Sequence, residues 1–264
     1  MFPKEKEDTI RENYGDWQTN YEFAKSVCLY LKNRGIVPDI VVEPTCGVGN
    51  FLAAAIDVFE TVKKVYGVEI FKGYVDQTEK KLQEYQKNNL IVSYELYNAD
   101  VFNFDFREIA NQNPDQNILV IGNPPWVTNS GLGKNDGVNL PVKGNINKTK
   151  GIEAITGKGN FDIAESICNQ IIDAFSHHGN THIALLVKNS VVKSIIHRQH
   201  FHPRRIQDVR QLVFDAKKEF NVSVPASLFE CHIGNDCQKE CISYDFYTKR
   251  ITHSFGWVNE AFVS

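Results

Sequence analysis

Apolar residues recur along this chain with two different periods, and the alternation between those periods predicts the architecture. Residues 20–34 carry apolar side chains at helical spacing, and Gly35 then favours the end of a helix. Short runs rich in β-branched residues predict strands that are buried on both faces. The predicted strands are 38–44, 63–70, 91–100, 117–123 and 181–188, and the helical segments between them are 50–62, 74–88, 106–113 and 161–176.

Strands that alternate with helices predict an α/β fold on a doubly wound, mainly parallel sheet. Further strand-like runs at 209–214, 224–233 and 243–249 predict a late antiparallel edge strand. We therefore expect three parts of the chain. They are an N-terminal helical segment at 1–35, a main domain at 36–240 and a C-terminal tail at 241–264.

Composition leaves the class of protein broad. The 264 residues are enough for one α/β domain, or for a domain with an appendage. No apolar run approaches the ~20 residues of a membrane span, and the charged N-terminus is unlike a secretory signal. We expect a soluble, cytoplasmic protein with no membrane partner. The net charge of −3 does not exclude a nucleic-acid partner, because a local basic patch is enough to meet phosphates.

The six cysteines are too few and too scattered for a disulfide scaffold. Cys231, His232, Cys237 and Cys241 could supply zinc ligands, but their spacing lacks the paired CxxC pattern of structural zinc sites. We expect reduced cysteines and no metal.

Gly47 and Gly49 lie where a predicted strand gives way to a helix. Glycines there let the backbone approach a ligand, and the helix that follows offers free amides. The spacing is not that of a dinucleotide fingerprint, because Leu52 occupies the last glycine position, and no Gly-Lys-Ser/Thr of a phosphate loop follows. A plain tight turn is the structural alternative.

Three acidic residues follow the ends of three consecutive predicted strands. Glu43 suits a cationic amino-acid group, Glu69 could accept both hydroxyls of a ribose, and Asp100 could accept from an adenine amino group. Each acid alone is an ordinary residue for a strand end. Together they line one crevice at the carboxyl edge of the sheet, where such folds bind ligands.

The strand at 117–123 ends in Asn123, Pro124, Pro125 and Trp126. Two prolines cannot continue a central strand, because each lacks the amide proton that the ladder needs. A stiff turn therefore holds a carboxamide and an indole at the sheet edge. In isolation this would be a plain turn followed by a core tryptophan.

The order of these motifs along the chain resembles that of the S-adenosylmethionine-dependent amino methyltransferases of DNA. The motifs are 43–51 with its two glycines, Glu69, Asp100 and the turn at 123–126. The match is to N6-adenine enzymes of restriction–modification systems, with the cofactor motif before the catalytic one, over roughly residues 15 to 235. It implies a Rossmann-like class I methyltransferase fold in which 36–240 is the catalytic domain and 1–35 caps the cofactor. The implied contacts of S-adenosylmethionine are Thr19, Glu43, Pro44, Thr45, Gly47, Gly49, Phe51, Glu69, Asp100 and Asn123.

The resemblance makes Asn123, Pro124, Pro125 and Trp126 the catalytic residues. The exocyclic amine of adenine is a poor nucleophile, and acceptors on its hydrogens would disperse the charge that grows during attack. The Asn123 side-chain oxygen and the Pro124 carbonyl are the implied acceptors, and Trp126 would stack on a flipped-out base. Cys46 lies in the cofactor turn and is expected to be a packed residue, not a cysteine nucleophile.

Substrate contacts are expected from two further places. Phe161 would lie beside the methyl donor, in a segment that resembles the helix after the catalytic loop. Residues 188–205, with Lys193 and Arg198, follow the fifth strand and are expected to meet DNA phosphates at the same edge. Residues 129–160 hold seven glycines and five lysines against two acids, and could clamp DNA or be an insertion without a role.

Several alternatives stay open from the sequence. Asn123 disfavours N4-cytosine enzymes, which usually have serine there, and Trp126 disfavours glutamine methyltransferases of release factors, which have tyrosine. RNA adenine methylation and a catalytically silent binding subunit remain alternatives. No target-recognition domain is recognisable after residue 240. Truncation, a separate specificity subunit or low specificity would each account for that.

Overall fold

The computed structural model describes residues 18–126 and 162–264, and residues 1–17 and 127–161 lie outside the described part. Its helices are α2 (Tyr21–Asn33), α3 (Asn50–Val58), α4 (Lys72–Lys87), the 3-10 helix η1 (Val101–Asn103), α5 (Arg107–Gln112), α8 (Ile163–Ala174), α9 (Asn189–Phe201) and α10 (Ala216–Phe220). Its strands are β1 (Ile40–Glu43), β2 (Lys64–Glu69), β3 (Ser93–Asn98), β4 (Ile118–Gly122), β5 (Thr181–Lys188), β6 (Ile206–Phe214), β7 (Ala226–Ile233), β8 (Glu240–Asp245), β9 (Ile251–Val258) and β10 (Ala261–Val263).

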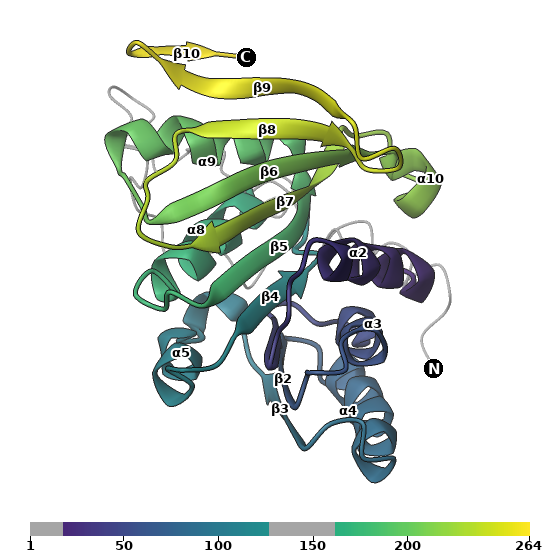
Figure 1. Ribbon diagram of the computed structural model, residues 1–264. Coiled ribbons are helices and arrows are strands. Elements are labelled where there is room, and N and C mark those ends of the chain that lie inside the picture. The colour runs from purple at the N-terminus through teal and green to yellow at the C-terminus, as the bar shows by residue number, and fades with distance from the viewer. Residues whose placement is uncertain (1–17, 127–161) are drawn as a thin grey trace, which may run out of the picture.

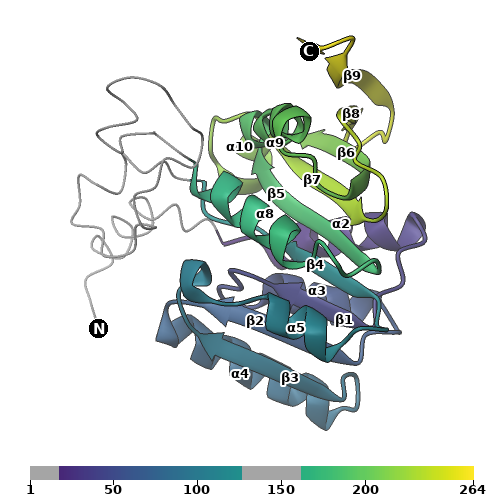
Figure 2. The same ribbon diagram turned by 90° about the vertical axis from the view of Figure 1, so that its left-hand side faces the viewer.

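All ten strands form one sheet in the order β10-β9-β8-β6-β7-β5-β4-β1-β2-β3 (Figure 1). The strands β3, β2, β1, β4 and β5 run parallel to one another. Helices α2, α3 and α4 cover one face of the sheet, and α5, α8 and α9 cover the other. Figure 2 shows the molecule from the side of this second group of helices. The predicted doubly wound α/β fold is therefore confirmed.

The antiparallel part of the sheet is larger than one edge strand. Strand β7 is inserted between β5 and β6 and is antiparallel to both. Residues 241–264, expected to be a tail, instead add most of β8 and all of β9 and β10 to the same sheet. The first residues of β9, 251–254, are all exposed. The strand pairs with β8 on one side and with β10 on the other.

The core lies on both faces of the central strands. Strands β1 and β4 are buried along their whole length, as expected for parallel strands covered by helices on two sides. Helix α3 buries three consecutive alanines, Ala53 to Ala55, which let it pack closely on the sheet and on α2. No helix in the described ranges is long and apolar enough to cross a membrane.

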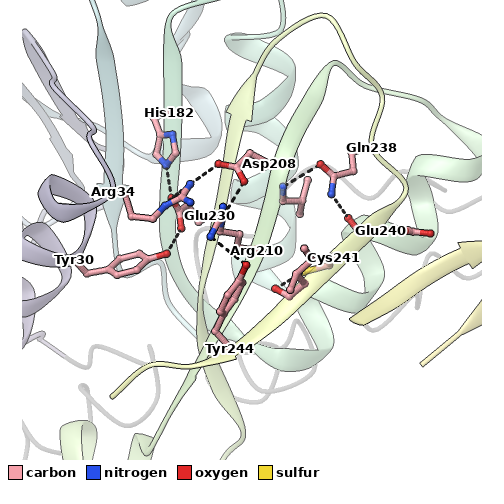
Figure 3. A network of polar contacts seen from close by, with 12 residues as sticks. Tyr30, Arg34, His182, Asp208, Arg210, Glu230, Gln238, Glu240, Cys241 and Tyr244 are labelled. Atoms are coloured by element: carbon pink, nitrogen blue, oxygen red, sulfur yellow. Dashed lines mark hydrogen bonds and ion pairs between the residues drawn. The ribbon is translucent and has the colours of Figure 1, made fainter. Parts of the chain in front are cut away.

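A polar network fastens the carboxyl end of α2 to the sheet (Figure 3). Its centre is Glu230 of β7, whose side chain is fully buried. The carboxylate accepts from the Tyr30 hydroxyl at 2.7 Å and from Arg34 Nε at 3.2 Å, and it lies 3.0 Å from His182 Nε2. Arg34 also pairs with Asp208 at the β6 bulge. Burial raises the pKa of Glu230, but these hydrogen bonds and charges outweigh it, and the net pKa lies below the ordinary value of 4.5.

Replacing Glu230 with glutamine is expected to lower the free energy of unfolding by about 3 kcal/mol at neutral pH, because Arg34 would lose its buried counter-charge. A depressed carboxylate pKa contributes stability above the pKa of the unfolded state and loses it as pH falls through the folded pKa. The difference between wild type and Glu230→Gln should therefore narrow below about pH 4.5. Urea denaturation over a range of pH measures both effects.

The matched control is Glu60→Gln. Glu60 pairs with Lys32 at 3.3 Å, but its side chain is 91% exposed, so its loss should change stability by less than about 0.5 kcal/mol. Equal stabilities of the Glu230 and Glu60 variants would show that the network does not anchor α2.

Candidate functional site

The glycine loop after β1 has the backbone geometry that only glycine adopts without strain. Gly47 and Gly49 have φ of +50° and +73°. Gly49 is the N-cap residue of α3, and a Cβ atom there would come within 2.6 Å of Thr78 Cγ2 on α4. The Thr78 hydroxyl donates to the Gly47 carbonyl at 2.9 Å. The loop is thus packed from behind by α4, and both glycines are required by shape.

Glu69 and Asp100 lie at the carboxyl ends of the neighbouring strands β2 and β3, as the strand pattern predicted, and Glu69 contacts the glycine loop. Glu69 ends β2 and is 8% exposed. One of its oxygens accepts from the Gly47 amide at 2.9 Å and the other from the Phe71 amide at 2.8 Å. Asp100 follows β3 and caps η1 by accepting from the Phe102 amide at 3.0 Å. Both carboxylates are held by backbone amides in defined orientations.

Glu43 at the end of β1 is 3% exposed. Burial raises its pKa well above the ordinary value and the charge of Glu69 adds to the rise, while a hydrogen bond from the Leu52 amide opposes it. A cationic group bound beside Glu43 would favour the ionised carboxylate. The Cys46 thiol is also buried, and burial raises its pKa well above the ordinary range, with Glu43 and Glu69 adding. Cys46 is therefore a packed residue without thiolate character.

Two observations fit a bound cofactor at this loop. The Thr19 hydroxyl is buried, and no residue in the described ranges hydrogen-bonds to it, so it is available to a ligand. The Gln18 carboxamide lies over Gly47, where a Cβ would collide with it, and its oxygen accepts from the Val48 amide at 3.3 Å. Phe51 differs from the other expected contacts, because it is 1% exposed and belongs to the hydrophobic core.

The Asn-Pro-Pro-Trp turn meets the glycine loop because β1 and β4 are adjacent. Gly122 ends β4 with no side chain, and a Cβ there would lie 3.3 Å from Glu43 Cγ and 3.6 Å from Pro44 Cδ. The Thr45 hydroxyl donates to the Asn123 carbonyl at 3.5 Å. The two motifs, separated by about 80 positions in the chain, thus lie side by side at the carboxyl edge of the sheet.

Trp126 is 9% exposed and packs into the core. Its indole nitrogen donates to the Leu186 carbonyl of β5 at 3.0 Å. The ring meets Phe220 of α10 edge-on, with centroids 5.2 Å apart, and lies 6.4 Å from the ring of Phe214. The orientation of the indole is therefore fixed by neighbours on three elements.

The residues expected to contact the substrate have different outcomes in the structure. Phe161 and the insertion 129–160 lie outside the described residues. The prediction that 188–205 faces the crevice edge is wrong for its second half, because α9 runs from the end of β5 back to the start of β6, which is parallel to β5. Lys193 is exposed near the start of α9, with Nζ 5.9 Å from the Phe255 ring, whereas Arg198 lies in its last turn. Arg204 is largely buried and bonds to Gln199.

Sequence reasoning missed several residues that build the site. Thr78 and Lys81 of α4 and Gln18 all bond to the glycine loop. Thr78 and Lys81 lie in no recognisable motif, whereas Gln18 belongs to the N-terminal segment that was expected to cap the cofactor. Each contact spans about 30 positions. The single available signal was the spacing of Thr78 and Lys81, which places both on one face of a helix.

The cysteine cluster does not form a metal site in the part of the chain that the structure describes, where no group of three or more histidine, cysteine or acidic residues could hold an ion. Cys231 and Cys241 are buried on β7 and β8, and Cys237 is exposed between them.

Comparison with known proteins gives one strong sequence match. A Type II methyltransferase, M.NspV from Nostoc sp. strain PCC 7524, is 40% identical over 218 residues, which are 83% of this chain and 44% of that protein. The chain thus spans less than half the length of this relative. No protein-family model matches.

Solved structures of low sequence identity share the fold. The methyltransferase subunit of a type I restriction–modification system from Streptococcus thermophilus has a TM-score of 0.53 at 15% identity, covering 94% of this chain and 50% of its own. The type IIG restriction endonuclease BpuSI has a TM-score of 0.54 at 15% identity, covering 86% of this chain and 27% of its own. At these identities the likeness supports the fold alone.

Replacing Gly49 with alanine is expected to weaken binding of S-adenosylmethionine by at least about tenfold. The positive φ costs roughly 1–2 kcal/mol for an L residue, and the Cβ would displace Thr78 and with it the loop. Titration calorimetry with the cofactor measures the affinity, and thermal denaturation measures the stability.

Gly73→Ala is the control for this substitution. Gly73 lies in the first turn of α4 with nothing within 4 Å of its added Cβ, so alanine should be neutral or slightly stabilising and should leave affinity unchanged. Unaltered affinity in Gly49→Ala would show that the loop does not hold the cofactor.

Three observations point to the same kind of protein. They are the order of strands in the sheet, the sequence identity to M.NspV, and the acids that backbone amides hold at the strand ends near the glycine loop. The strand order around β1 and β4 puts the loop and the Asn-Pro-Pro-Trp turn at the edge where open α/β sheets bind their ligands. The identity to M.NspV extends over most of the chain. Over this length the chain is related to a Type II methyltransferase, and the cofactor of such enzymes is S-adenosylmethionine.

Proposed function

We propose that this protein transfers the methyl group of S-adenosylmethionine to the N6 amine of adenine in DNA. The observation that carries the proposal is the crevice wall where Thr45 of the cofactor loop meets Asn123 of the catalytic turn. A methyl donor and an acceptor amine bound on either side of that contact would be neighbours. The match to a Type II methyltransferase supports DNA as the substrate class.

The cofactor would be held by the glycine loop, the Thr19 hydroxyl and the three strand-end acids. Glu43 would face its amino group, Glu69 its ribose hydroxyls and Asp100 its adenine. When bound, S-adenosylmethionine supplies an electrophilic methyl group on a sulfonium, which leaves as a thioether. The backbone amides that already orient Glu69 and Asp100 mean that little reorganisation is needed on binding.

Asn123 and Pro124 would activate the adenine amine. Their oxygens accept its two hydrogens and favour a tetrahedral nitrogen, whose lone pair forms the new N–C bond and whose surplus proton then passes to solvent. The fixed φ of Pro124 holds its carbonyl direction. The indole of Trp126, held through Leu186, would offer the flipped base a stationary ring.

Positive charge at the crevice edge would meet DNA phosphates. Helix α10 follows the end of β6 and therefore lies at the carboxyl edge of the parallel strands. It exposes Lys217 and Lys218 and places Phe220 against Trp126. These lysines, with Lys193 near the start of α9, are better placed for phosphate contacts than the second half of 188–205.

Incubation with S-adenosylmethionine labelled in the methyl group and unmethylated bacterial DNA tests the proposal. RNA is assayed in parallel, and the products are digested to nucleosides and separated. The expected product is N6-methyladenine in DNA. Label in RNA, in N4-methylcytosine or in protein alone would overturn the assigned substrate.

Asn123→Ala is expected to lower the rate of methyl transfer at least about 100-fold, as loss of one group that stabilises developing charge does in other enzymes. Cofactor affinity, measured by calorimetry, should stay close to that of wild type. Asn235→Ala, at an exposed residue in the β7–β8 connection, is the control and should keep full activity. Undiminished transfer by Asn123→Ala would remove Asn123 from the mechanism.

A further inference from the structure

Lys81 of α4 lies behind the glycine loop and reaches it with its ammonium group. Its Nζ donates to the Val48 carbonyl at 2.8 Å and to Asn50 Oδ1 at 2.8 Å. Thr78, one turn earlier on the same face of α4, donates to the Gly47 carbonyl. Two successive carbonyls of the loop are therefore satisfied by side chains of a single helix, and the Lys81 bonds are charge-assisted.

Asn50 extends this contact to the segment before α2. Its Nδ2 donates to the Thr19 carbonyl at 2.8 Å. The oxygen and nitrogen of the Asn50 side-chain amide cannot exchange places, because the Lys81 ammonium can only donate and the Thr19 carbonyl can only accept. Lys81, Asn50 and Thr19 thus form a chain of hydrogen bonds from α4, through the first residue of α3, to the segment that carries the buried Thr19 hydroxyl, which has no partner among the described residues.

We propose that Lys81 and Asn50 are positioning residues that couple the glycine loop to the capping segment at Thr19, so that both hold S-adenosylmethionine as one unit. The inference rests on the cofactor site of the proposed function, but not on the identity of the methyl acceptor. Neither side chain needs to touch the cofactor. Lys81 acts on the loop carbonyl, and Asn50 transmits the loop position to the cap.

Two variants separate this role from folding. Lys81→Met keeps the aliphatic stem and removes the ammonium. Asn50→Asp keeps the acceptor for Lys81 but loses the donor to Thr19, and a carboxylate at the first residue of a helix favours folding. Lys80→Met is the control, because Lys80 is an exposed neighbour with the same charge.

Calorimetry with S-adenosylmethionine should show at least about tenfold weaker binding for Lys81→Met and for Asn50→Asp, as expected for loss of hydrogen bonds that hold the site. Lys80→Met should bind like wild type. In methyl transfer, only KM for the cofactor should rise. The kcat at saturating cofactor and KM for DNA should stay unchanged. Hydrogen exchange without cofactor should be faster at residues 18–20 in both variants.

Each result has a distinct meaning. Wild-type affinity in both variants, with cofactor bound normally by wild type, would overturn the coupling and leave the proposed function intact. Absence of cofactor binding by wild type would overturn the cofactor site and, with it, the coupling. If Lys81→Met unfolds, Asn50→Asp decides, because it should fold at least as well as wild type and still bind the cofactor weakly.

Discussion

The parallel pairing of β1 with β4 is the constraint on which the site depends. Val42 lies opposite Val120 in that pairing, so the loop after β1 and the turn after β4 leave the sheet side by side. Helices after these strands lie on opposite faces, and open α/β sheets bind ligands where the order of strands reverses in this way. A Cβ atom at Gly122 would lie 3.3 Å from Glu43 Cγ, so a larger residue there would require Glu43 to shift. The glycine loop and the Asn-Pro-Pro-Trp turn are neighbours because β1 pairs with β4.

Helix α2 is held at both ends and joins the parts of the site. At its carboxyl end, Tyr30 and Arg34 bond to Glu230 in the buried network (Figure 3). At its amino end, Asn20 caps the helix and Thr19 meets Asn50. Between these ends, Phe23 packs against Phe214, Phe220 and Phe246. Since Phe220 also contacts Trp126, one aromatic cluster connects α2 with the Asn-Pro-Pro-Trp turn.

The strands after β7 extend the sheet at the edge opposite β3. Helix α9 packs against β9, and Trp257 stacks on His200 with ring centroids 4.1 Å apart. The Trp257 indole also donates to the His197 carbonyl at 3.1 Å. These contacts make residues 241–264 part of the same structural unit as the central parallel strands.

Local features of the chain were sufficient to predict the helix–strand alternation, the glycine loop, the three strand-end acids and the Asn-Pro-Pro-Trp turn. Backbone conformation at Gly49 and the end of a strand at Pro124 depend on the chemistry of a few adjacent residues. The direction of α9, the strands β9 and β10 and the bonds of Lys81 could not be predicted in this way. They depend on which distant segments pair and pack, and hydrophobic periodicity carries no information about partners 30 or 200 positions away.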